Sequence, residues 1–487
     1  MPVLEIAAGR LEGRRADDAV AFQGIPYGTA PRFAPPGPVE GWAGIRDATR
    51  PGPAAPQPRR AAAVFTHGEL PATDEQCLNL NVFSPPLDGR RPVFVWLHGG
   101  GFAIGHAGAS LYAGNRLASA IDAVIVTVNY RLGSLGWVGH PDLGADPGAP
   151  AANWGLLDQI AALRWVRDNI AAFGGDPGNV TLAGQSAGAL SAMDLLVAPR
   201  AAGLFQRVVL QSPPLGDVAQ PPAVAKAWAE ALSGAAGGTG AFDVARLRLL
   251  DANEVVDLHE QLLEQPEWRG TRGGALPTVD PGSLPASPVD EPDASPDVDV
   301  LIGHTADEGT FFFASPWRPP PPPELVADIV AHLCPREDAH AVLDRYHGDL
   351  VAIATEAMVA GPVARWAEAR AEAVGGRSAV YRYRVDFPGA GEQLRATHTV
   401  EVPLLFGTWT DGGPGERLGG QADNAGAVSG ELTAAWGRFV HGESPGWARE
   451  GVNESPTNSD GLTLDTRSET VYSFPRWAQV SAFEGET

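Results

Sequence analysis

Short, unbroken runs of apolar residues recur along the chain and predict buried strands. They occupy residues 92–97 (PVFVWL), 123–128 (AVIVTV), 179–183 (NVTLA) and 207–210 (RVVL). Runs of this length that are rich in β-branched residues are typical of strands covered on both faces. A further strand signal follows much later, at 379–385 (AVYRYRV).

Helical periodicity separates these strands. Residues 155–171 place apolar side chains at helical spacing, and FGGDPGN then gives a stop-and-turn signal. Residues 186–197 predict a second helix directly after NVTLA. Strands that alternate with helices indicate βαβ units and a mainly parallel sheet. Residues 1–60 are instead rich in Gly and Pro, and they favour edge strands and turns.

Two stretches interrupt this alternation. Residues 213–300 are rich in Ala, Pro and Asp, with a helical pattern near 222–265, and the polyproline segment RPPPPP precedes a helical pattern at 324–374. We therefore expect a single α/β domain over residues 1–487, with helical inserts at about 213–275 and 320–375.

The composition narrows the range of partners and compartments. The 487 residues carry a formal net charge of -23, which disfavours nucleic-acid and membrane-surface partners. The two cysteines, Cys77 and Cys334, exclude a disulfide framework and lack the spacing of a metal site. No secretory signal is visible, and no apolar run approaches the ~18–20 residues of a bilayer span. We expect a cytoplasmic protein that is a monomer or a small homo-oligomer.

The pentapeptide GQSAG at 184–188 supplies a candidate nucleophile, Ser186. It follows a predicted strand and opens a predicted helix, which is the setting that a nucleophile elbow requires. The glycines permit a strained turn, and the helix N-terminus directs amide groups at a developing oxyanion. The alternative is an incidental Gly-rich turn.

The segment HGGGF at 98–102 follows the strand at 92–97 and predicts an oxyanion hole. Successive glycines let backbone N–H groups line a concave surface, which the amide of Ala187 would complete. A flexible loop or a phosphate loop is the alternative, although the GxxxxGK[ST] spacing of the latter is absent.

A serine nucleophile needs a base and an acid, which follow it in the order acid, then histidine, in this type of site. His398 is favoured because it comes after the strand at 379–385 and a short loop. Glu308 follows the strand signal in VDVLIGHTAD, at the strand end where α/β sheets place functional groups, and Asp307 is its rival. The other histidines after the serine are His259, His304, His332, His340, His347 and His441.

Beyond these motifs, the chain resembles the type-B carboxylesterases, which include the bacterial para-nitrobenzyl esterases and the cholinesterases. The resemblance runs from about residue 20 to residue 440. It rests on FQGIPYGTAP, EQCLNLNVFSP, HGGGF, the segment from NWGLLDQ to GQSAGA, LIGHTADEGTFFF and THTVEVPLLFG. It implies an α/β-hydrolase fold and a serine carboxylesterase that acts on small to medium, mainly apolar esters without a metal or organic cofactor.

The resemblance also implies residue roles. Ser186 is the nucleophile, Glu308 in the D-E-G triplet is the acid in preference to Asp307, and His398 in the H-x-x-E-x-P-x-x-F-G segment is the base. The remaining implied residues are the oxyanion donors Gly100, Gly101 and Ala187 and a buried triad-supporting serine, Ser212. Residues adjacent to the motifs are expected to line an apolar pocket: Phe102, Phe311, Phe312, Leu405 and Phe406.

Two departures from the family pattern carry predictions. Gln185 stands where the family usually has Glu, which implies a neutral variant of a buried polar network. Cys77 lacks the upstream cysteine that often pairs with it, so we expect a free, buried thiol. The alternative functions are a carbamate or amide hydrolase with the same triad, a lipase, and a non-catalytic binding relative.

Overall fold

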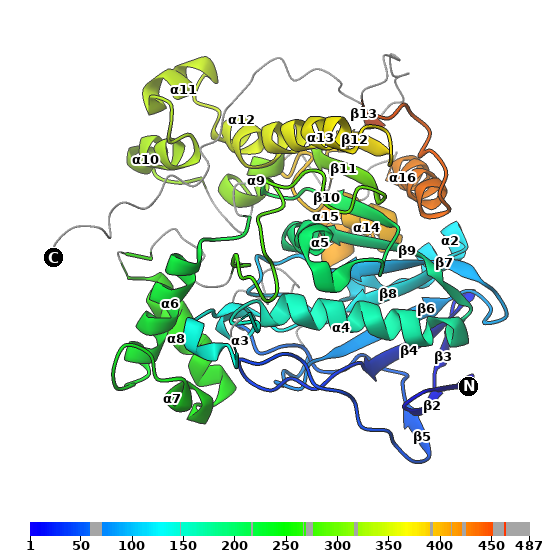
Figure 1. Cartoon of the computed structure of the whole chain (residues 1–487). Helices are drawn as coiled ribbons and strands as arrows, with labels where there is room; N and C mark the ends of the chain where they lie inside the picture. Colours follow the sequence, from blue (N-terminus) through cyan, green and yellow to red (C-terminus); the bar gives the residue numbers. More distant parts are fainter. Residues whose placement is uncertain are drawn as a thin grey trace.

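A ten-stranded sheet forms the centre of the computed structural model, which describes residues 1–58, 71–146, 148–215, 218–265, 267–268, 276–315, 320–389, 393–410, 412–420, 425–450 and 462–463 (Figure 1). The strand order is β13-β12-β11-β10-β9-β7-β8-β6-β4-β3. These strands span β3 Arg14–Ala16, β4 Ala19–Pro26, β6 Asn79–Ser84, β7 Arg91–Leu97, β8 Val124–Val128, β9 Gly175–Gln185, β10 Arg207–Gln211, β11 Asp299–Thr305, β12 Val380–Val385 and β13 Leu462–Thr463. A separate small sheet contains β1 Val3–Ile6, β2 Gly9–Glu12 and β5 Ile45–Asp47.

The six central strands of the large sheet, from β8 to β12, pair in parallel, and antiparallel strands flank them on both sides. The carboxyl ends of the parallel strands therefore meet at one edge, where α/β sheets bind their ligands. The predicted parallel sheet and α/β-hydrolase fold are confirmed.

Side chains of alternate residues on the central strands enter two different core layers. In β7, Val93 and Val95 pack in one layer, whereas Phe94 and Trp96 pack in the other. Helices α4 and α5 cover the first layer, and α2, α14 and α16 cover the second. The bounds of these helices are α2 Asn115–Ile121, α4 Trp154–Asn169, α5 Ala187–Val197, α14 Glu401–Phe406 and α16 Ala425–Val440. Burial on both faces explains why the strands read as unbroken apolar runs.

The turn predicted at FGGDPGN lies partly within a strand. Gly174, with φ 79°, ends the helical segment after α4, but β9 already begins at Gly175. The register against β7 then jumps from Gly175 to Val180, so the intervening turn residues form an irregularity in β9.

Both predicted inserts contain helices. The first range holds α6 Pro222–Ala235, α7 Val244–Leu249 and α8 Ala252–Leu263, which gather at the lower left of Figure 1. The second holds α10 Pro323–Leu333, α11 Ala339–Arg345, α12 Leu350–Thr355, a π-helical turn at Glu356–Ala360 and α13 Gly361–Val374. The shorter helices elsewhere are α3 Gly133–Trp137, α9 Glu308–Phe313 and α15 Gly413–Gly419.

Within the described residues, one continuous helical run, Leu350–Val374, is long and apolar enough to cross a membrane by length and composition. The sequence predicts a helical pattern over 324–374, but its apolar character over this length was not recognised. Two thirds of its apolar window is buried inside the fold, as in the core helices of globular proteins.

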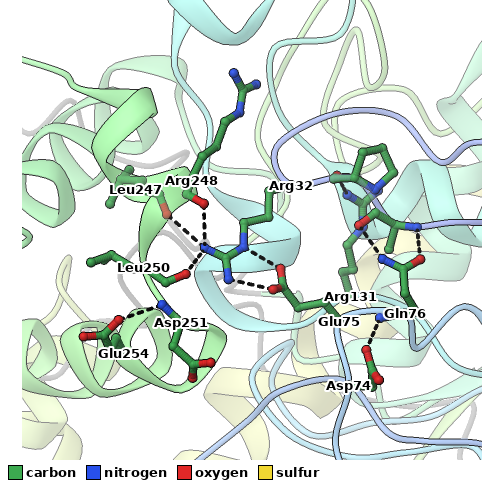
Figure 2. A network of polar contacts seen from close by, with 12 residues as sticks. Arg32, Asp74, Glu75, Gln76, Arg131, Leu247, Arg248, Leu250, Asp251 and Glu254 are labelled. Atoms are coloured by element: carbon green, nitrogen blue, oxygen red, sulfur yellow. Dashed lines mark hydrogen bonds and ion pairs between the residues drawn. The ribbon is translucent and has the colours of Figure 1, made fainter.

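Two arginines, Arg32 and Arg131, connect the N-terminal segment around residue 32 with the first insert and with the core (Figure 2). Arg32 pairs with both oxygens of Glu75, at 2.5 and 2.6 Å, and also donates to the carbonyls of Leu247 and Leu250 at the end of α7. Arg131 pairs with the buried Asp158 and donates to a carbonyl of the same N-terminal segment. These planar, multiply bonded guanidinium groups fix how the first insert meets the core.

Candidate active site

Ser186 lies in the sharp turn between β9 and α5. Its backbone has φ 57° and ψ −123°, a strained conformation for a non-glycine residue. The flanking glycines make this turn possible: a Cβ on Gly184 would lie 2.3 Å from the backbone of Gly188, and a Cβ on Gly188 would lie 2.0 Å from the carbonyl oxygen of Leu97. This strained strand-turn-helix is the local geometry that a nucleophile elbow requires.

The glycine loop after β7 lies against this elbow. A Cβ on Gly99 would lie 3.2 Å from the Cβ of Ser186. Gly100 and Gly101 follow with φ of 119° and 62°, so both adopt backbone conformations that favour glycine. Ala187 is the first residue of α5, where helix geometry provides no acceptor for the N–H group.

Packing brings His398 and Glu308 together from distant parts of the sequence. Nδ1 of His398 lies 2.5 Å from Oε2 of Glu308, and Oε1 of that carboxylate accepts the N–H of Thr305 at 2.7 Å. Burial alone would raise the pKa of Glu308. The adjacent imidazole and the hydrogen bonds to the carboxylate outweigh burial and hold the pKa below its ordinary value. Glu308 is therefore an ionised carboxylate that can orient and stabilise the imidazole.

Asp307, the rival acid, has a different set of contacts. Its N–H donates to the carbonyl of Ala396 at 2.9 Å, its carboxylate accepts the N–H of Ala396 at 3.2 Å, and Arg395 lies 3.6 Å from it. Asp307 thus holds the loop that leads into His398, whereas the imidazole itself contacts Glu308.

The second ring nitrogen of His398 contacts a residue that the sequence did not connect with it. Nε2 of the imidazole lies 3.0 Å from the side-chain amide nitrogen of Gln185. Among the described residues, no hydrogen bond joins the hydroxyl of Ser186 to this imidazole. Catalytic hydrogen bonds often tighten only when substrate is bound.

A second buried carboxyl group, Glu401, lies behind the site. Gln211 donates to Glu401 at 3.3 Å, and Ser212 lies near both Glu401 and Glu308. The Ser212 hydroxyl lowers the pKa of both carboxyl groups, although it makes no hydrogen bond of good geometry within the described residues. Burial and the charge of Glu308 nevertheless raise the pKa of Glu401 to about 8.

The five predicted pocket residues divide into two groups. Phe311 and Phe312 are partly exposed, and their rings lie 5.6 and 5.2 Å from the imidazole of His398. Phe102, Leu405 and Phe406 are almost completely enclosed and pack in the buried core, so their exposure lends no support to the prediction that they line a pocket. Phe102 packs against Trp137, and the two residues on α14 enter the core layer opposite α5 because their helix covers that face of the sheet.

The prediction that Cys77 is a free, buried thiol is confirmed. Both Cys77 and Cys334 are free and buried, and burial raises the pKa of each thiol. Within the described residues, no group of three or more His, Cys, Asp or Glu side chains is arranged to hold a metal ion.

A strained serine at a strand-to-helix turn, a glycine loop beside it and a histidine paired with a buried carboxylate define a serine hydrolase of the α/β type. Comparison with known proteins narrows this class. The model of the carboxylesterase family matches residues 1–325. Phenmedipham hydrolase of Pseudarthrobacter oxydans is 34% identical over 92% of this chain and 92% of its own. Para-nitrobenzyl esterase of Bacillus subtilis is 33% identical over 91% of this chain and 90% of its own.

The solved structures that are similar to this chain include esterases of the same kind. A thermophilic para-nitrobenzyl esterase superposes with a TM-score of 0.79 at 32% identity, over 93% of this chain and 92% of its own. A carboxylesterase of Geobacillus stearothermophilus gives a TM-score of 0.75 at 33% identity, over 92% of each chain. The chain belongs to the carboxylesterase family, and it is a serine hydrolase of small-molecule carboxylic esters. The binding-protein alternative is thereby removed.

Proposed function

We propose that Ser186, His398 and Glu308 form the catalytic triad and that Gly100, Gly101 and Ala187 form the oxyanion hole. The contact between Nδ1 of His398 and Glu308 carries the proposal, because it selects one acid and one histidine from many candidates.

The reaction proceeds through an acyl-enzyme. His398 accepts the hydroxyl proton of Ser186 through Nε2 as the oxygen attacks the ester carbonyl. The backbone N–H groups of the oxyanion hole stabilise the negative charge that develops on the carbonyl oxygen. The imidazolium then protonates the departing alcohol, and water releases the acid by the same route. Glu308 holds the proton on Nδ1 and stabilises the imidazolium.

The proposal includes small to medium, mainly apolar substrates. Phe311 and Phe312 support this choice, since their partly exposed rings flank the catalytic imidazole. It also includes one catalytic domain with two helical inserts, a monomer or small homo-oligomer, and no nucleic-acid or membrane partner. A cytoplasmic location is proposed from the two free thiols.

The test compares p-nitrophenyl acetate hydrolysis by the wild type and by Ser186→Ala. The variant should lose activity by several orders of magnitude while it retains the wild-type melting temperature. Equal rates in the two folded proteins would remove Ser186 from the mechanism. Parallel assays with the corresponding anilide and carbamate determine whether the same site also cleaves those bonds.

A further inference from the structure

Gln185 presents its side-chain amide to the catalytic histidine. It is the last residue of β9, it directly precedes Ser186, and only 1% of it is exposed. Because Nδ1 of His398 faces the Glu308 carboxylate, the proton of the neutral ring lies on Nδ1 and leaves a lone pair on Nε2. The Gln185 amide therefore donates to that lone pair, across 3.0 Å.

The other end of the same amide is buried without a partner. Within the described residues, Oε1 of Gln185 accepts no hydrogen bond. It lies beside the glycine loop after β7, 2.7 Å from the position that a Cβ on Gly99 would occupy. Exchanging the two amide atoms would turn an oxygen lone pair toward the lone pair of Nε2, which is repulsive. The hydrogen bond to His398 thus determines the orientation of the amide, and it leaves Oε1 of Gln185 without a hydrogen-bond donor.

We infer that Gln185 is a positioning residue for the catalytic base: its amide holds Nε2 of His398 in the substrate-free enzyme and releases it to Ser186 when substrate binds. The inference rests on the proposed roles of Ser186 and His398. When the serine proton moves to Nε2, this nitrogen becomes a donor and no longer accepts from the amide. Rotation of the amide would then present its unpaired oxygen to the new N–H group.

The groups around His398 explain why a neutral residue at 185 matters. Glu308, from α9, is the carboxylate in direct contact, and Glu401, from α14, lies behind it next to Ser212. The aromatic neighbours from α9 are uncharged. A donor on Nε2 stabilises the neutral base, whereas a carboxylate at the same position would stabilise the imidazolium.

Two variants separate charge from hydrogen bonding. Gln185→Glu places a carboxylate at Nε2, and Gln185→Met fills the same volume without a donor. For Gln185→Glu, the midpoint of the acid limb of kcat/KM should rise by about one pH unit. For Gln185→Met, it should rise less, in the same direction. Gln261→Glu, an exposed change on α8 with the same charge, should leave the midpoint unchanged.

An NMR titration of the His398 imidazole in the same proteins measures the effect without turnover. The resonance is assigned by its absence in His398→Asn. Coincident titration midpoints in the wild type, Gln185→Glu and Gln185→Met would overturn the inference even if all three hydrolyse esters. If the wild type does not turn over substrate, the proposed function fails, and the titration still decides whether Gln185 controls the base.

Discussion

Two adjacent carboxylates, Asp307 and Glu308, show how the tertiary fold separates neighbours into different roles. Glu308 is buried and contacts the imidazole of His398. Asp307 is partly exposed and binds the backbone of the loop that precedes His398 in the sequence. In the proposed mechanism, a contact with the ring stabilises the positive charge that forms on the imidazole of His398. A contact with the loop affects only where the ring sits.

Glu308→Gln should therefore lower kcat/KM by about 10³–10⁴-fold, since the amide neither stabilises the imidazolium nor enforces the right tautomer. Asp307→Asn, the matched control, should lower kcat/KM by less than about tenfold, because it weakens only contacts with the loop. Steady-state hydrolysis of p-nitrophenyl acetate measures both. A larger loss in Asp307→Asn than in Glu308→Gln would reverse the assignment of the acid.

At the scale of elements, one side chain, Arg32, links the N-terminal segment to the first insert. Arg32 joins Glu75 to the carbonyls at the end of α7, where the last turn of a helix leaves its acceptors without intrahelical partners (Figure 2). The side chain is only 13% exposed, so water cannot easily replace these bonds.

Arg32→Ala should lower the free energy of unfolding by about 2–3 kcal/mol and should increase amide hydrogen exchange in α7 and α8 before exchange in the central strands. The matched control is Arg248→Ala, because that residue is exposed and contributes only its backbone carbonyl to the network. Hydrogen exchange followed by mass spectrometry compares the two variants. If amide protection of α7 and α8 were the same in Arg32→Ala as in Arg248→Ala, packing alone would hold the insert in place.

For the whole molecule, buried carboxyl groups contribute to the dependence of stability on pH. Burial raises the pKa of Asp194 on α5 well above its ordinary value. Below the unfolded pKa near 3.8, the side chain is protonated in both states. As pH rises toward the folded pKa, the unfolded chain releases its proton while the folded chain retains it, so stability falls. Glu401 contributes in the same direction up to about pH 8, and Glu308, whose pKa is lowered, contributes in the opposite direction.

Asp194→Asn should remove part of the fall in the free energy of unfolding that accompanies rising pH. The variant should match the wild type near pH 4 and should exceed its free energy of unfolding by about 1–2 kcal/mol at pH 8. Urea unfolding at several pH values gives both curves. Asp88→Asn, an exposed change of the same charge, should run parallel to the wild type. A parallel curve for Asp194→Asn would mean that this carboxyl group finds a partner in the folded state.

The sequence alone determined the parts of this protein that depend on neighbouring residues. Strands buried on both faces must be apolar throughout, which made β7, β8, β9 and β10 visible as runs. The elbow at Ser186 is a local strand-turn-helix whose close backbone contacts require glycine, and GQSAG displays that requirement directly. The resemblance to carboxylesterases, carried by motifs in a fixed order, correctly predicted the family and the fold.

Contacts between side chains that are distant in the sequence depend on tertiary packing. Glu308 and Gln185 contact His398 across 90 and 213 residues of sequence, and only the packing of β9, α9 and the loop before α14 brings them together. The same packing placed Phe102, Leu405 and Phe406 in the core and left Phe311 and Phe312 beside the imidazole. An apolar residue next to a motif is equally suited to the buried core and to the surroundings of the catalytic site. Its position depends on which face of the sheet its helix or loop covers.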